Sequence, residues 1–187
     1  DALPILIERK VEGVAIMTFG IEEPLLDQLA KRKVPLVFID VAPERPACSV
    51  LKVDYHHGIR QGVQHLAALG HRHIAFITGP AKLHSAHSRA VAFSKSLKEC
   101  GIAPNPAWIV EGDHTLEGGV AATEQLLSAK PRPTAVMCSN DMTAIGVLHK
   151  LYRAGLRVPD DLSVVGFDDI HIAEVTSPPL TTIQMSG

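Results

Sequence analysis

The fold is decided by residues 135–183, which read AVMCSNDMTAIGVLHKLYRAGLRVPDDLSVVGFDDIHIAEVTSPPLTTI. An apolar run at 135–138 opens this stretch, and a helical spacing of apolar residues follows it and ends near Gly155. A second apolar run, at 162–167, ends at Asp168 and Asp169. Short apolar runs that alternate with helices are typical of βα units in a parallel sheet. The stretch therefore predicts two buried strands joined by a helix.

Polar side chains follow both predicted strands. Asn140 comes shortly after the first strand, and Asp168 comes directly after the second. Because ligands of open α/β sheets bind beyond the carboxyl ends of the strands, both residues are candidates for a small-molecule site. For Asp168 the pattern leaves a second interpretation open, which is a cap for a helical segment that begins at Ile170.

The same alternation covers the rest of the chain. The apolar spacing predicts further strands at 14–17, 35–40, 50–53, 73–78 and 108–111. It predicts further helices at 1–10, 24–33, 54–69, 85–100 and 116–129, and a surface loop at 41–46. Asp54 is the expected N-cap of its helix, and Val91, Phe93 and Leu97 are expected to face inward from the helix at 85–100. The predicted fold class is α/β with parallel sheets.

The composition is that of an ordinary globular protein, with 46% apolar and 20% charged residues. A formal net charge of -2 gives no global electrostatic reason to expect binding to nucleic acid. No apolar run approaches the roughly 18 residues of a membrane-spanning helix, and no signal peptide is evident, so we expect no membrane partner. Cys48, Cys100 and Cys138 lack the spacing of a disulfide or metal site, which favours buried, reduced thiols in a cytoplasmic protein.

Three motifs carry a family resemblance. SNDMTAIGVL at 139–148, GLRVPDDLSVVGFDDI at 155–170 and PPLTTI at 178–183 closely resemble the effector-binding domain of the LacI/GalR family of bacterial transcription regulators. The stretch at 53–80 also resembles the family's crossover into its second subdomain. The resemblance implies a type I periplasmic-binding-protein-like fold, in which two doubly wound parallel-sheet subdomains flank a ligand cleft.

In that fold, residues 1–53 are expected to form part of the N-terminal subdomain and residues 54–187 the C-terminal subdomain. The chain is expected to be a fragment that lacks the family's helix-turn-helix domain and a further segment at each end. The resemblance also implies an effector-sensing domain of a cytoplasmic, homodimeric repressor. Such a domain binds a small polar ligand, with a sugar as the preferred class. The closure that follows alters operator binding through the missing DNA-binding domain.

The resemblance assigns six residues to the ligand cleft, in two tiers: Asp40, Arg89, Asn140 and Asp168, then Ser85 and His114. Phe19, just after the first predicted strand, is a further candidate for the opposite wall. Carboxylates accept hydrogen bonds from hydroxyls, an arginine donates through a rigid fork, and an amide does both, which suits a sugar. Ser85 is expected in a loop that faces the ligand, and His114 stands where several relatives stack an aromatic ring on it. Arg89 on a helix surface and Phe19 in a core are the alternatives.

Rival functions find less support in the sequence. The ten histidines form no pair or set with metal-ligand spacing, so neither a metal nor a cofactor is expected. A serine hydrolase would need a G-x-S-x-G elbow, which is missing. Asp168 and Asp169 are adjacent strand-end residues, which tend to point to opposite faces and make a poor glycosidase pair. We expect no enzyme, and a periplasmic sugar-binding protein of a transport system remains the alternative.

Overall fold

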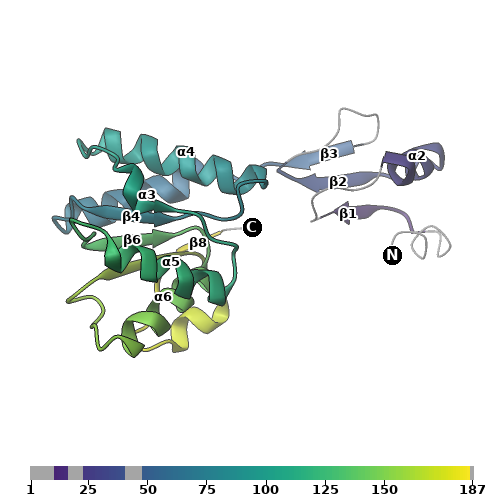
Figure 1. The fold of residues 1–187 in the computed structure, drawn as a ribbon. Helices are drawn as coiled ribbons and strands as arrows, with labels where there is room; N and C mark the ends of the chain where they lie inside the picture. The colour runs from purple at the N-terminus through teal and green to yellow at the C-terminus, as the bar shows by residue number, and fades with distance from the viewer. Residues whose placement is uncertain (1–10, 17–22, 41–47, 186–187) are drawn as a thin grey trace. The chain divides into compact units, whose positions relative to one another are not determined.

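The computed structural model describes residues 11–16, 23–40 and 48–185. The helix predicted at 1–10, the loop predicted at 41–46 and Phe19 lie outside the described residues. The chain divides into two compact units, Asp1–Val53 and Asp54–Gly187, and each contains a parallel sheet of its own (Figure 1). That these units are two subdomains of one effector-binding domain remains a prediction.

The first unit contains a three-stranded sheet in the order β1-β2-β3 with all strands parallel. Its described elements are β1 (Val14–Ile16), α2 (Glu23–Lys31), β2 (Leu36–Ile39) and β3 (Cys48–Leu51). The apolar core is small and consists of Ile16, Leu26, Leu29, Leu36 and Phe38. The sequence predicts the last strand at 50–53, and the structure places it two residues earlier.

The second unit contains a five-stranded, all-parallel sheet in the order β5-β4-β6-β7-β8. Its strands are β4 (Ile74–Ile77), β5 (Ile109–Val110), β6 (Ala135–Cys138), β7 (Ser163–Asp168) and β8 (Thr181–Gln184). The chain leaves β4 toward β5 on one side and then returns to β6 on the other. The order therefore reverses between β4 and β6, and sheets of this kind bind ligands at that switch point.

Helices cover both faces of this sheet. Figure 1 shows α3 (Tyr55–Ala68) and α4 (His84–Glu99) on one face, with α5 (Leu116–Ser128) and α6 (Asp141–Arg153) on the other. Two short 3-10 helices, at Pro106–Trp108 and His171–Val175, lie in the connections. Asp54 caps α3 as predicted, because its carboxylate accepts a hydrogen bond from the backbone N–H of His57 at 3.0 Å. No helix in the described ranges is both long and apolar enough to span a membrane.

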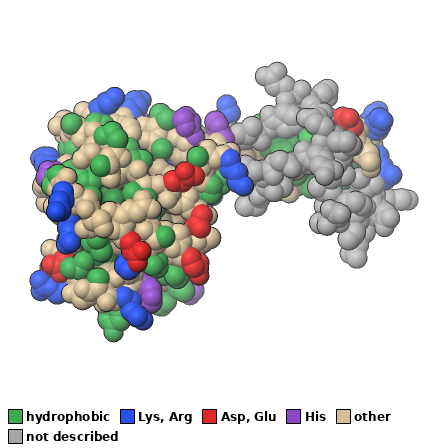
Figure 2. All heavy atoms as spheres, in the orientation of Figure 1, with side chains coloured by type: hydrophobic (Ala, Val, Ile, Leu, Met, Phe, Trp, Pro, Cys, Tyr) green, Lys and Arg blue, Asp and Glu red, His purple; other side chains and the backbone are tan. Residues whose placement is uncertain are grey.

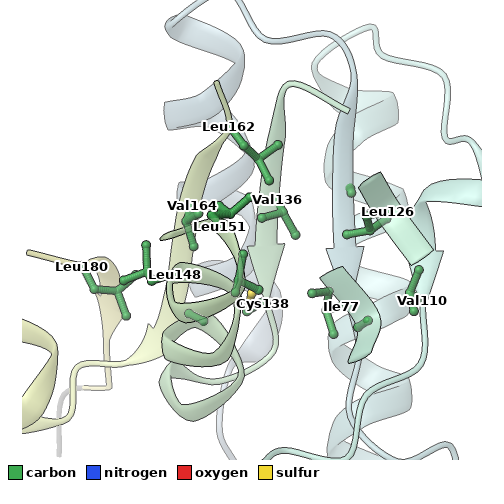
Figure 3. Close-up of a cluster of buried hydrophobic side chains, with 14 of the residues drawn as sticks. Ile77, Val110, Leu126, Val136, Cys138, Leu148, Leu151, Leu162, Val164 and Leu180 are labelled. Atoms are coloured by element: carbon green, nitrogen blue, oxygen red, sulfur yellow. The ribbon is translucent and has the colours of Figure 1, made fainter. Parts of the chain in front are cut away.

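The main core lies between the sheet and the pair α5 and α6 (Figure 3). All four residues of β4 and all four of β6 are buried, as expected for central strands of a parallel sheet covered on both faces. Cys138 ends β6 inside this core, where burial strongly raises the pKa of its thiol. Cys48 and Cys100 are only partly buried, so the prediction of buried thiols is correct for Cys138 alone.

Two details of the sequence-based prediction are wrong. Val91 is expected to face inward from α4 but is 53% exposed, whereas Phe93 and Leu97 are buried. Residues four apart share a face of a helix and residues two apart do not, so Val91 cannot lie on the face of Phe93 and Leu97. Trp108 is expected in a strand, but it ends a 3-10 helix, where its indole N–H donates to the carbonyl of Pro131 at 3.0 Å.

Candidate functional site

Arg89 is a buried arginine on α4, the helix that follows β4. Only 7% of it is exposed, so the alternative of a helix-surface arginine is wrong. Its guanidinium carbon lies 4.5 Å from the ring centroid of Tyr55 and 4.7 Å from that of Phe167. Both rings present electron-rich faces that stabilise a cation removed from water. α3 and β7 thus hold the arginine in one place.

The guanidinium of Arg89 reaches the ends of two neighbouring strands. Its Nη1 donates a hydrogen bond to the backbone carbonyl of Ser139, just after β6. Its Nη2 lies 3.8 Å from Oδ1 of Asp168, the last residue of β7. Its Nε is buried and has no hydrogen-bond partner among the described residues. A buried donor without a partner is unusual in a folded protein, and it leaves Arg89 able to bind a further acceptor.

Asp168 is a carboxylate that the protein makes easier to protonate. Its pKa is raised to about 6, chiefly by burial; Arg89 opposes this rise and the nearby Asp141 adds to it. Its backbone is in the left-handed region, with φ of 119°. The alternative of a helix cap at Ile170 is wrong, because no side chain caps the 3-10 helix that starts there. At neutral pH Asp168 is therefore an acceptor that lies beside a buried cation.

His114 lies in the connection between β5 and α5 and packs against the backbone of Gly79. A Cβ built on Gly79 would lie 1.9 Å from Nε2 of His114, so only glycine permits this contact. Burial lowers the pKa of His114, the charge of Arg89 lowers it further, and Asp113 opposes both. The imidazole is therefore uncharged at neutral pH, and its Nε2 has no hydrogen-bond partner in the described parts of the chain.

Asn140 links the end of β6 to the His114 segment. Its Oδ1 accepts from the backbone N–H of Thr143 at 3.0 Å and caps α6, and its Nδ2 donates to the carbonyl of His114 at 3.0 Å. The amide can still accept one hydrogen bond and donate one. Asn140 is thus a helix cap first, and its role as a ligand contact stays a prediction.

Of the seven residues predicted for the site, the structure brings together four: Arg89, His114, Asn140 and Asp168. Arg89, His114 and Asn140 come after β4, β5 and β6, and Asp168 is the last residue of β7, so all four belong to the carboxyl ends of the strands near the switch point of the second unit. Ser85 is buried in the first turn of α4, which agrees with the predicted helix and not with the loop position that the resemblance implies. Asp40 belongs to the first unit, where its Oδ1 accepts from the backbone N–H of Val53 at 3.4 Å.

Three residues that matter here are not predicted from the sequence: Tyr55, Phe167 and Asp141. Tyr55 and Phe167 resemble ordinary core residues, since nothing in the sequence says that their rings hold an arginine. Asp141 resembles a favourable acidic residue in the first turn of α6, but it is completely buried. A carboxylate at a helix start usually lies in solvent, so only the structure reveals its position.

Charged side chains elsewhere in the described residues form no second candidate for a functional site. Figure 2 shows Lys and Arg side chains and Asp and Glu side chains spread over the visible face of the second unit without an extended patch of one sign. Among the residues that the structure describes, no three histidine, cysteine or acidic side chains are grouped so as to hold a metal ion. The described site is a polar cluster in which the buried cation Arg89 lies beside the carboxylate of Asp168, with the buried carboxylate of Asp141 behind it.

The contact between Gly79 and His114 can be tested directly. We expect Gly79→Ala to push the imidazole out of its packed position, because the new methyl group would overlap the ring. The pKa of His114 should then rise toward its ordinary value of 6.5, since burial and the charge of Arg89 lower it in the native chain. Proton NMR of the histidine rings against pH measures this, with the other histidines as internal controls. An unchanged His114 midpoint would contradict the packing.

Comparisons with known proteins identify the family of the chain. The model of the periplasmic binding protein-like domain matches residues 63–186. A LacI transcriptional regulator from a Rhodococcus species superposes with a TM-score of 0.87 at 34% identity, over 98% of this chain and 67% of that one. The chain belongs to the LacI/GalR family. The predicted resemblance and fold class are thus confirmed, and the matched region is the family's effector domain.

Two other LacI/GalR relatives are informative. The HTH-type transcriptional repressor PurR of Photobacterium profundum is 38% identical over 184 residues, which is 98% of this chain and 55% of that protein. The CelR–cellobiose complex superposes with a TM-score of 0.85 at 32% identity, over 98% of this chain and 57% of that one. The chain thus spans about half the length of the curated relatives that it matches. These relatives are named as transcriptional regulators and not as enzymes.

Proposed function

We propose that the second unit of this LacI/GalR-family chain binds a small, uncharged polar effector, of which a sugar is the favoured class. The observation that carries the proposal is the buried guanidinium of Arg89 held between two rings and beside Asp168 at the switch point. Such a cation orients hydrogen-bond donors with little loss of side-chain entropy, because its position is fixed before a ligand arrives.

The charges around this site favour an uncharged ligand. Asp168 offsets the positive charge of Arg89, and His114 carries no charge at neutral pH. Little positive charge therefore remains for a phosphate, whereas sugar hydroxyls can donate to Asp168 and accept from Arg89. The relative CelR was solved as a complex with cellobiose, which supports the sugar class. Asp40 and Ser85 are proposed as further contacts, and Phe19 stays a prediction.

For the whole protein we propose the activity of a transcriptional repressor controlled by this effector. The relatives named as HTH-type repressors support a DNA-binding domain outside this chain. An effector that binds one closure state of the two units better than the other would shift the population toward that state. A DNA-binding domain coupled to that equilibrium would gain or lose affinity for its operator. A homodimer is part of this proposal, because two DNA-binding domains match two operator half-sites.

A thermal-shift panel tests the proposal. The chain is heated with monosaccharides, disaccharides, sugar phosphates, nucleosides and purines, and Asp168→Asn and Asp160→Asn are run beside it. A ligand at 100 times its Kd should add about 2.7 kcal/mol to the free energy of unfolding. We expect one uncharged class to shift the wild type and Asp160→Asn, since Asp160 pairs with Arg157 at an exposed site, but not Asp168→Asn. An equal shift of all three would refute the proposed site.

A further inference from the structure

Asp141 is a carboxylate with no exposed surface, at the first position of α6. Its Oδ1 accepts a hydrogen bond from the hydroxyl of Thr182 on β8 at 2.6 Å. Its Oδ2 accepts from the backbone N–H of Ile170, just after β7, at 2.9 Å. The start of α6 favours a negative charge, and two donors satisfy the carboxylate. One buried side chain therefore joins three elements of the second unit.

The segment that Asp141 holds is strained. Asp168 and Asp169 both have positive φ, 119° and 59°, although neither is a glycine. Such a conformation is unfavourable for residues with a Cβ, so it persists only where surrounding contacts fix it. Asp169 is tied to β8 by Gln184, whose Nε2 donates to its Oδ2 at 2.9 Å. The bond from Ile170 to Asp141 closes the turn on its other side.

Asp141 also lies against the backbone of β7, the strand that ends at Asp168. A Cβ built on Gly166 would lie 2.1 Å from Oδ1 of Asp141, so the carboxylate lies directly against the backbone of β7. Gly166 precedes Asp168 by two residues on the same strand. The carboxylate thus touches the segment both before and after Asp168, while Asp168 itself lies beside Arg89.

We propose that Asp141 is a positioning residue for Asp168: it holds the left-handed turn that places the Asp168 carboxylate beside Arg89. Asp141 does not face the ligand, and acts through Asp168. The consequence of this role for effector binding rests on the proposed function, whereas the placement of the Asp168 carboxylate does not.

The described charged groups around Asp168 come from several elements. Arg89 on α4 lowers the pKa of Asp168, and Asp141 on α6 and burial raise it. Asp169 follows it in the turn and is bonded to Gln184 on β8. His114 faces Arg89 and is uncharged at neutral pH. Removal of the Asp141 charge therefore removes one of the two influences that raise the pKa of Asp168.

The test is a carboxyl-carbon NMR titration of the 187-residue chain without any ligand. The wild-type midpoint of Asp168 should lie near pH 6. In Asp141→Asn we expect it to fall by about one pH unit, as follows from losing a like charge close by at an intermediate dielectric constant. Asp160→Asn removes an exposed charge and should leave the midpoint unchanged. An unchanged midpoint in Asp141→Asn would overturn the proposal.

A second pair of variants decides the question if Asp141→Asn does not fold. Thr182→Val keeps the side-chain shape and removes the hydroxyl that donates to Asp141 and accepts a 3.4 Å hydrogen bond from the backbone N–H of Asp169. Hydrogen exchange at the Ile170 amide, which donates to Asp141, should become at least several-fold faster. Thr181→Val, at an exposed neighbour on β8, is the matched control and should leave that rate unchanged. Equal exchange in both variants would overturn the proposal. Because neither experiment uses an effector, a failed ligand panel would not affect them.

Discussion

Replacement of Arg89 by alanine is expected to lower the free energy of unfolding by about 3 kcal/mol. The side chain fills the space between Tyr55 and Phe167, so its truncation leaves a cavity in the second unit. The carbonyl of Ser139 also loses its hydrogen bond, and Asp168 loses the cation that favours its ionised form. The variant should also lose effector binding, which tests the proposed function.

Urea denaturation followed by circular dichroism measures the effect. Arg89→Met keeps an unbranched stem between the rings and should lose less stability than Arg89→Ala, because the packing is largely retained. Arg157→Ala is the matched control: this arginine is exposed and pairs only with Asp160 and Asp161 among the described residues, and such pairs contribute little. If Arg89→Ala were as stable as Arg157→Ala, the guanidinium could not be buried in solution.

Much of the fold could be predicted because the central strands are buried on both faces. A strand such as β6 consists only of apolar residues, and this continuous run stands out between polar stretches. The helices around it can be found from the periodic spacing of their apolar residues, because each helix buries one apolar stripe against the sheet. The order of the strands is not predicted, because the apolar pattern does not encode which strands become neighbours.

The errors occur where the local pattern is ambiguous. Val91 is apolar but lies on the outer face of α4, and a lone apolar residue on a surface is common. The family resemblance puts Ser85 in a loop, whereas the apolar spacing predicts a helix from Ser85, and the helix in fact begins at His84. Helix ends depend on one or two backbone hydrogen bonds, so the sequence determines them poorly.

The candidate site was partly predictable. Asp168 and Asn140 stand at strand ends, which the topology brings to one edge of the sheet. Arg89 could be assigned only through the family resemblance, because its burial depends on Tyr55 from α3 and Phe167 from β7, which are far from it in sequence. The left-handed turn at Asp168 and the burial of Asp141 arise from tertiary contacts with β8, and no local pattern signals them.

The close packing of α5 on α6 depends on two glycines, one on each helix, and each lies against the backbone of the opposite helix. A Cβ on Gly119 would lie 2.2 Å from the carbonyl oxygen of Thr143, and one on Gly146 would lie 2.1 Å from that of Leu116. Both obstacles are backbone atoms of the opposing element, which a side-chain rotation cannot move. The two helices must therefore separate before either position accepts a methyl group, and the core beneath them must open with them.

For this reason Gly119→Ala is expected to lower the free energy of unfolding by about 3 kcal/mol, at the upper end of the usual effect of overpacking. This loss outweighs the gain of up to about 1 kcal/mol that alanine brings to a helix interior. Gly118→Ala is the matched control, since the methyl group there meets only the exposed carboxylate of Asp113, whose rotation costs its exposed hydrogen bonds from Thr115 but moves no backbone. Thermal and urea unfolding should therefore separate two substitutions of the same type at adjacent positions. If both variants unfolded alike, α5 and α6 could not approach each other as closely as the structure has them, and the core between them and the sheet would be looser.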